Sequence, residues 1–187
     1  MLDRLFAKGV RLAQQGPLLT APATIRDSRS MSKATRATQA LEKAGIVFSL
    51  QHYDYDPAAD RIGMQAAQAL GELPSRVLKT LMALVDGKPV CVILPSDREV
   101  AMKRLAAAAG GKAAQMMKPA DAERMTGYKV GGISPFGQMR VVPTFLEEAA
   151  LTEAQVYVNG GQRGLQIRLD PRRIVEVLAA KAAALVA

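Results

Sequence analysis

The 187-residue chain has one cysteine, one histidine and no tryptophan. A single cysteine, Cys91, excludes a disulfide within the chain, which fits a reducing compartment, so we expect the protein in the cytoplasm. His52 is the one histidine, so no zinc site of several Cys and His ligands can form. A relay between a histidine and a nucleophile would have to use His52. We therefore expect neither a metal nor another cofactor.

Aromatic residues and long apolar runs are also scarce. Aromatics make up 4% of the chain, so a platform that stacks many bases is not expected. No run of 18 apolar residues occurs, which excludes a membrane-spanning helix of the usual kind. The 49% hydrophobic and 22% charged residues are typical of a globular protein, and the length fits one domain.

Positive charge is what the chain has in excess. Its 25 Lys and Arg residues against 17 Asp and Glu give a net charge of +8. Such an excess favours a polyanionic partner through neutralisation of phosphates, although it carries no sequence specificity. A basic protein without a nucleic-acid partner remains the alternative at this stage.

The first 30 residues differ from the rest, because they mix Arg, Gln, Pro and Thr without a sustained period. Gly16 and Pro17 interrupt the apolar stretch that a signal peptide would need. Met31-Ser32-Lys33 is typical of a second start just before a helix. We interpret 1–30 as a poorly ordered extension and 31–187 as the folded domain.

Helix caps, alternating apolar residues and turn signals predict the elements of this domain. Strands joined by hairpins outnumber what a repeat of alternating strands and helices would contain. This favours the α+β class, with a mixed, largely antiparallel sheet, curled or barrel-like, and surrounding helices. The expected elements are a helix over 32–44 capped by Ser32, a strand over 46–53, a helix over 64–70, strands over 77–85 and 89–94 around an Asp86-Gly87 turn, a helix over 100–109 capped by Ser96 or Asp97, a helix over 119–125, strands over 138–142, 155–159 and 165–169, and a helix from Asp170-Pro171 to the end.

Three segments could carry chemistry. Strand alternation places Lys79 in an apolar row, where its ammonium must snorkel, pair or meet a ligand, with Thr80 as a neighbouring hydroxyl. Four glycines within 127–137 could present backbone N–H groups to a phosphate or carbonyl, or form a plain turn. The segment 159–164 needs no function beyond a hairpin loop, and His52 is more typical of a structural residue than of a base.

Taken together, these segments resemble the YbaK/EbsC family of free-standing aminoacyl-tRNA deacylases, which are related to the editing domain of bacterial prolyl-tRNA synthetases. The resemblance extends from about Met31 to the C-terminus and is strongest to the YbaK branch. It implies hydrolysis of Cys-tRNA(Pro) and Cys-tRNA(Cys), with tRNA(Pro), tRNA(Cys) and prolyl-tRNA synthetase as possible partners. The residues that carry it are Tyr53, Asp56-Pro57, Val77-Leu78-Lys79-Thr80-Leu81, Thr126-Gly127-Tyr128, Gly131-Gly132-Ile133-Ser134-Pro135, Gly137, Gly160-Gly161 and Arg163-Gly164-Leu165.

The resemblance also implies a site. Lys79 would reach the aminoacyl end or the terminal adenosine, and Gly131 and Gly132 would offer backbone groups near the ester. No protein nucleophile is used in this branch, where the thiol of the substrate attacks the ester and a cysteine thiolactone leaves. The residues expected to bind substrate are Tyr53, Ile62, Thr80, Ser134, Asn159, Gly160 and Gln166.

Three of these positions depart from the branch, which commonly has an aromatic residue at Ile62, a serine at Asn159 and an aspartate at Gln166. Two other functions therefore stay open. One is a deacylase for another small aminoacyl group, such as Ala-tRNA(Pro), that uses an activated water. The other is an RNA-binding module without turnover.

Overall fold

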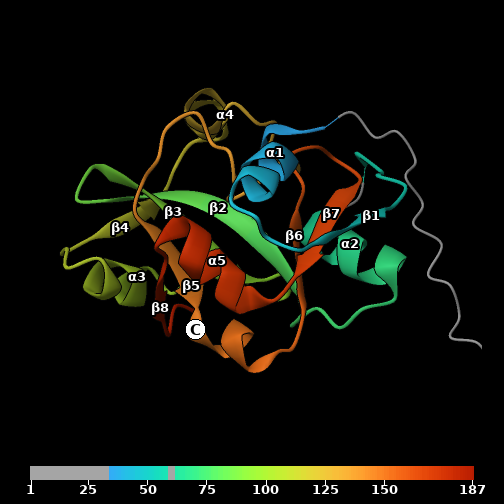
Figure 1. Cartoon of the computed structure of the whole chain (residues 1–187). Helices are drawn as coiled ribbons and strands as arrows, with labels where there is room; N and C mark the ends of the chain where they lie inside the picture. The colour runs from blue at the N-terminus through green and yellow to red at the C-terminus, as the bar shows by residue number, and fades with distance from the viewer. Residues whose placement is uncertain (1–33, 59–61) are drawn as a thin grey trace, which may run out of the picture. The chain divides into compact units, whose positions relative to one another are not determined.

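The computed structural model describes residues 34–58 and 62–187 (Figure 1). The predicted extension 1–30 lies outside the described residues and stays a prediction. The elements in chain order are α1 (Arg36–Lys43), β1 (Ser49–His52), α2 (Ile62–Leu70), β2 (Val77–Val85), β3 (Lys88–Pro95), α3 (Met102–Ala108), β4 (Ala114–Met116), α4 (Pro119–Thr126), β5 (Thr144–Glu147), the 3-10 helix η1 (Glu148–Thr152), β6 (Val156–Asn159), β7 (Leu165–Leu169), α5 (Pro171–Leu178) and β8 (Lys181–Ala183).

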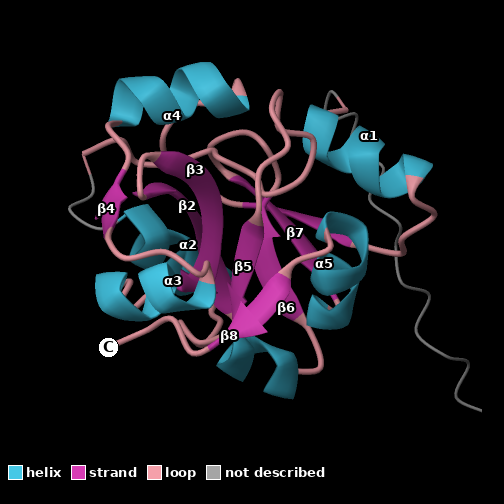
Figure 2. Cartoon of the chain, turned by 90° about the vertical axis from the view of Figure 1, so that its left-hand side faces the viewer, coloured by secondary structure: helices cyan, strands magenta, loops and turns pink. Residues whose placement is uncertain are grey.

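The strands form one mixed sheet in the order β1-β7-β6-β2-β3-β5-β8, and β4 pairs with β2 outside this path. The pairs β1–β7, β6–β7, β2–β3 and β2–β4 are antiparallel, whereas β2–β6, β3–β5 and β5–β8 are parallel. Helices lie around the outside of the sheet, which bends strongly along β2 and β3 (Figure 2). The predicted fold class is confirmed.

The long hairpin of β2 and β3 forms because its turn residues accept left-handed backbone angles. Asp86 has φ of 47° and Gly87 has φ of 78°, as a two-residue hairpin turn requires. Both faces of this hairpin are buried. Leu78 and Met82 pack into one apolar core, while Ala83 and Val85 pack into a second core that the C-terminal Leu185 completes.

One edge of β2 changes partner along its length. The parallel strand β6 pairs with Val77 and Leu78, and the antiparallel β4 pairs with Ala83 to Val85. Neither strand covers the edge at Thr80 and Leu81. The sheet therefore has a gap between β6 and β4, and this gap positions the pocket described below.

In the C-terminal half, two predicted elements are wrong and one strand was missed. The strand expected over 138–142 is absent there, since Val141 is 97% exposed, and β5 begins only at Thr144, where it pairs with β3. The last helix ends at Leu178, because Ala179 takes a left-handed conformation, and β8 follows in place of more helix. The short strand β4 was not predicted.

Helix caps were predicted in part. Asp170 caps α5 through the N–H of Arg172, as expected from the Asp-Pro pair. Thr35 rather than Ser32 caps α1, and Ser32 lies outside the described residues. Helix α3 begins after Ala101 without a side-chain cap, so the predicted role of Ser96 or Asp97 is wrong. Among the helices in the described part of the chain, none is long and apolar enough to cross a membrane.

Candidate functional site

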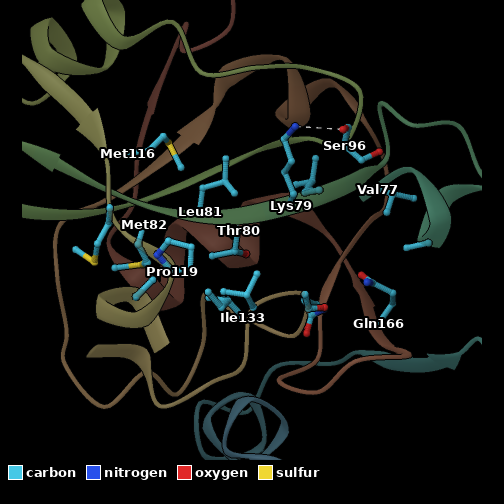
Figure 3. A pocket seen from close by; sticks show the side chains of 17 residues that line it. Val77, Lys79, Thr80, Leu81, Met82, Ser96, Met116, Pro119, Ile133 and Gln166 are labelled. Carbon is cyan, nitrogen blue, oxygen red and sulfur yellow. Dashed lines mark hydrogen bonds between the residues drawn. The ribbon is translucent and has the colours of Figure 1, made fainter. Parts of the chain in front are cut away.

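A pocket of about 280 Å³, here called the acyl pocket, lies at the gap in the sheet edge of β2. Its wall is mostly aliphatic and comes from β2, α2, α4, the glycine loop and the ends of β6 and β7 (Figure 3). The residues that line it are Ala66, Val77, Leu78, Lys79, Thr80, Leu81, Met82, Ser96, Met116, Met117, Pro119, Ala122, Val130, Gly131, Ile133, Asn159 and Gln166.

Lys79 and Thr80 enter this pocket from opposite sides of β2. Lys79 and Leu81 extend to one side, and Thr80 extends to the other, towards Ile133 (Figure 3). The ammonium of Lys79 donates to the carbonyl oxygen of Ser96 at 3.2 Å. The half-buried lysine is thus held at the pocket by a backbone carbonyl, as its place in an apolar row requires.

Two buried oxygen atoms at the pocket lack a partner. Among the described residues, neither Thr80 Oγ1 nor Gln166 Oε1 makes a hydrogen bond, although these residues are only 7% and 4% exposed. A buried polar atom without a partner costs about 1–3 kcal/mol, so such atoms indicate a missing ligand or water. Gln166 Oε1 can only accept a hydrogen bond, which favours a ligand group that donates, whereas the Thr80 hydroxyl can accept or donate.

Gln166 is also tied to the predicted binding residue Tyr53. Burial raises the pKa of Tyr53, while hydrogen bonds with the Gln166 side chain and with the Gly164 backbone oppose that rise. The Tyr53 ring therefore stays neutral at physiological pH. Tyr53 lies next to the acyl pocket rather than in its wall.

The glycine loop and the 159–164 loop are held together by Asn159. Its amide nitrogen donates to Gly131 O at 2.9 Å, and its amide oxygen accepts from the N–H of Gly161 at 2.9 Å. Gly132 sits where a Cβ would lie 3.0 Å from the backbone nitrogen of Arg163, so the two loops approach closely. The N–H of Gly132 donates to Lys129 O at 2.8 Å within its own loop.

The first turn of α1 holds both loops from outside. Thr35 Oγ1 donates to Gly160 O at 2.6 Å. Arg36 donates to Thr126 O at 3.1 Å, and its guanidinium lies 4.5 Å from the ring centre of Tyr128. Residues far apart in the sequence thus fix the loops that border the pocket.

The structure brings most of the predicted site residues together, but not all. Lys79, Thr80, Gly131, Asn159 and Gln166 line the pocket, and Gly132 and Gly160 lie in the loops behind it. Ser134 is fully buried outside the lining, and its hydroxyl accepts from the N–H of Phe136. Ile62 is the first residue of α2, and its side chain lies outside the described part.

The aliphatic wall of the pocket and the carbonyl that holds Lys79 could not be identified from the sequence. Ala66, Ile133 and Met116 are apolar side chains of the kind that also fill cores, so no local signal marks them as pocket residues. The carbonyl of Ser96 could not be found from its residue type, because every residue carries one.

Among the side chains that line the pocket, those of Thr80, Ser96 and Lys79 are of types that can act as nucleophiles when a base activates them. Among the described residues that line it, none is His, Cys, Asp or Glu. Burial raises the pKa of the Cys91 thiol to about 12, so this residue is an inert part of the core. His52 is exposed at the end of β1 and is absent from the lining. The site can therefore position and polarise a substrate, but it offers no activated nucleophile.

The sequence of the chain also matches a known family. The profile of the aminoacyl-tRNA editing domain matches residues 56–177. Because this is more than half of the chain, the protein belongs to the aminoacyl-tRNA editing family. The predicted resemblance and the predicted class, an aminoacyl-tRNA deacylase, are confirmed.

Individual relatives agree with this membership. EbsC of Enterococcus faecalis, described as a candidate Cys-tRNA(Pro)/Cys-tRNA(Cys) deacylase, is 31% identical over 151 residues, which are 80% of this chain and 91% of EbsC. Proline–tRNA ligase of Maridesulfovibrio salexigens is 29% identical over 100 residues, which are 54% of this chain and 17% of the ligase.

Solved structures share the fold. The crystal structure of a candidate trans-editing enzyme for prolyl tRNA synthetase superposes with a TM-score of 0.70 at 24% identity, covering 82% of this chain and 96% of that one. A hypothetical protein superposes with a TM-score of 0.73 at 23% identity, covering 82% of this chain and all of the other. At these identities the structures support the fold alone.

Proposed function

We propose that the protein clears mischarged tRNA by hydrolysing Cys-tRNA(Pro), and that it also deacylates the correctly charged Cys-tRNA(Cys). The observation that carries this proposal is the acyl pocket itself, which is small and aliphatic and is lined by no Cys, His, Asp or Glu among the described residues. A substrate that brings its own nucleophile, as a cysteinyl ester does, suits such a pocket. The 31% identity to EbsC supports the same substrate.

In this proposal the amino acid enters with its α-ammonium towards Thr80 Oγ1 and Gln166 Oε1. These buried oxygens lack a partner among the described residues, and an ammonium supplies three donors. A pocket of about 280 Å³ accommodates a short side chain such as that of cysteine. Gln166 has polarity without negative charge, so it attracts the ammonium less strongly than an aspartate would.

The chemical step then needs positioning more than acid–base groups. The substrate thiol gives up its proton, its sulfur bonds to the ester carbonyl carbon, and the carbon–oxygen bond to the ribose breaks. The ribose 3′ oxygen leaves with a proton, and the four-membered thiolactone that forms is later opened by water to free cysteine. Holding sulfur and carbonyl close supplies much of the acceleration.

Lys79 and Gly131 take different parts in this step. Lys79 contributes a positive charge for the ribose or phosphate of the terminal adenosine. Gly131 is the backbone group assigned to the ester, because it lines the pocket whereas the N–H of Gly132 already donates to Lys129. Gly132 and Asn159 keep the two loops in contact and so act as positioning residues.

The net charge of +8 suits a tRNA partner, and we propose that the protein acts in the cytoplasm, where it could work beside prolyl-tRNA synthetase. Binding of tRNA should weaken steeply with salt, with a slope of log K against log salt several units negative. A flat salt response would point to a small-molecule substrate.

The alternative is a water-using deacylase for another small aminoacyl group, such as Ala-tRNA(Pro). The same two buried oxygens favour it, since they could hold a water in place of an ammonium. An RNA-binding module without turnover would use the same surface and would hydrolyse nothing.

Single-turnover deacylation of Cys-, Ser-, Ala- and Pro-tRNA(Pro) separates these functions. We expect Cys-tRNA(Pro) to react fastest, with the thiolactone detected by mass spectrometry before water opens it. Ser-tRNA(Pro), which lacks the thiol, should react far more slowly. Cys91→Ala should keep the rate and the product, because Cys91 is buried away from the lining. Equal rates for Cys- and Ser-tRNA(Pro) would rule out the thiol step. If none of the four substrates is hydrolysed, the protein is an RNA-binding module without turnover.

A further inference from the structure

A second pocket, of about 440 Å³, opens beside the acyl pocket. It is formed where the chain leaves β1 and where it enters β7, and we call it the aromatic pocket. His52, Tyr53 and Tyr55 line it from the first segment, and Arg163 lines it from the second. Two of the four tyrosines and the one histidine of the chain meet here, although aromatics are only 4% of the sequence.

Two flat side chains in this pocket already stack on each other. The guanidinium of Arg163 lies 5.3 Å from the ring centre of Tyr55. Arg163 is exposed, and its Nε donates to Val130 O at 2.9 Å, which limits its movement. Tyrosine rings and arginine planes are the surfaces on which nucleobases stack in single-stranded RNA sites.

The aromatic pocket is one side chain away from the acyl pocket. Tyr53 hydrogen-bonds with Gln166, and Arg163 bonds to Val130, and both Gln166 and Val130 line the acyl pocket. A ligand that fills both pockets must therefore present a flat group close to an acyl group, as the end of an aminoacylated RNA strand does.

We propose that the aromatic pocket binds an unpaired base of the tRNA 3′ end and so guides the ester into the acyl pocket. This inference rests on the proposed function, which it deepens. Asp54 also lines the pocket, and its carboxylate opposes a phosphate there. The ligand is therefore a base with its ribose, and Asp54 can accept from a base amino group or a ribose hydroxyl.

Binding of uncharged tRNA(Pro) to Tyr55→Ala tests the inference as a two-way cycle. Wild type and variant are each titrated with intact tRNA and with tRNA whose unpaired 3′ nucleotides lack their bases but keep their phosphates. Tyr55→Ala and base removal should each weaken binding by about 5- to 100-fold, and together by little more than either alone. Additive losses, or no loss on base removal, would overturn the inference.

Two further variants separate stacking from charge and from folding. Tyr55→Phe keeps the ring and should retain most of the affinity. Arg163→Ala is matched by Arg168→Ala, which removes another exposed arginine, whose guanidinium lies 6.0 Å from the centre of the Tyr157 ring, outside the aromatic pocket. If Arg168→Ala weakens binding as much as Arg163→Ala does, charge alone accounts for the effect and the inference fails.

The outcome is independent of turnover, because the titration uses uncharged tRNA. Coupling between Tyr55 and the 3′ bases without any deacylation would sink the proposed function but keep the binding site. Deacylation of Cys-tRNA(Pro) without this coupling would keep the proposed function and remove the aromatic pocket from it.

Discussion

The loops beside the acyl pocket and the turn after α3 both contain glycines with positive φ, for different reasons. Gly110 has φ of +71°, and a Cβ there would meet nothing within 4 Å. Gly137 has φ of +62°, and a Cβ there would lie 2.4 Å from the carbonyl oxygen of Arg36. The first turn needs glycine only for its backbone angle, whereas the pocket loop also needs it to fit against α1.

This difference extends to the other contacts of the two regions. The pocket loops are held by side chains that bond to distant backbone atoms, such as those of Thr35, Arg36 and Asn159. The far side of the β2–β3 hairpin is held by an aliphatic core, in which Leu105 and Leu185 are fully buried. The pocket loops therefore add individual polar contacts to buried apolar side chains such as Phe136, whereas the far side of the hairpin is held by buried apolar area.

Gly137→Ala against Gly110→Ala gives the largest expected difference. Gly110→Ala should lower the free energy of unfolding by about 1–2 kcal/mol, the usual cost of a left-handed non-glycine residue. Gly137→Ala adds an overlap with backbone that cannot move aside, so a loss of more than about 3 kcal/mol is expected. Urea denaturation measures both, and equal losses would show that α1 yields at no cost.

Lys79→Ala should reduce single-turnover deacylation by about 10- to 100-fold, since a charged hydrogen bond contributes about 1.5–3 kcal/mol. The variant should stay folded, because it removes a half-buried charge from an apolar row. Lys88→Ala, at the exposed hairpin turn, is the matched control and should react like wild type. If Lys79→Ala reacts within twofold of the wild-type rate, Lys79 takes no part in the reaction and its ammonium only extends towards solvent.

Arg36→Ala should slow the reaction by about 5- to 10-fold through the loops, because Arg36 bonds to Thr126 and stacks on Tyr128 without lining the pocket. The rate at saturating substrate should fall more than the affinity does. Lys43→Ala removes the same charge from the exposed last turn of α1 and serves as the control. A fall in affinity for both variants would indicate a charge effect on tRNA binding.

Asp86→Asn should have the smallest effect and should affect only stability. The N–H groups of Lys112 and Ala113 hold the pKa of Asp86 below its ordinary value. Its stabilising contribution is therefore present above the ordinary pKa of about 4 and is lost as pH falls below it. Between pH 5 and pH 3, the melting temperature of the variant should depend less steeply on pH than that of the wild type. Deacylation should be unchanged. An identical pH dependence would contradict this.

Turn and capping rules correctly predicted the turns and helix starts whose conformation depends on neighbouring residues. The Asp86-Gly87 turn and the Asp170-Pro171 helix start follow from the residues at those positions. These rules failed where pairing with a strand distant in the sequence determines the element. Val141 and Val142 resemble a strand, but the pairing with β3 starts at Thr144, and the alanine-rich end of the chain forms β8 because β5 is there to pair with it.

The site, too, could be predicted only where the local sequence marks it. Lys79 is conspicuous as a charge within an apolar strand, and the glycines of 127–137 are conspicuous by number. Strand alternation places Lys79 and Thr80 on opposite sides of β2. The gap in the edge beside them depends on where β6 and β4 stop, which no residue in β2 encodes. Tyr55 and Arg163 likewise meet only because β1 pairs with β7.

The hydrogen bond from Thr35 to Gly160 joins residues 125 positions apart, and this has a consequence for timing. A ribosome releases the N-terminal part first and adds about 5–20 residues per second. Roughly 6 to 25 seconds therefore pass between the synthesis of Thr35 and the synthesis of Gly160, to which Thr35 bonds. Until Gly160 has been made, an unfinished chain lacks this contact between the start of α1 and the 159–164 loop.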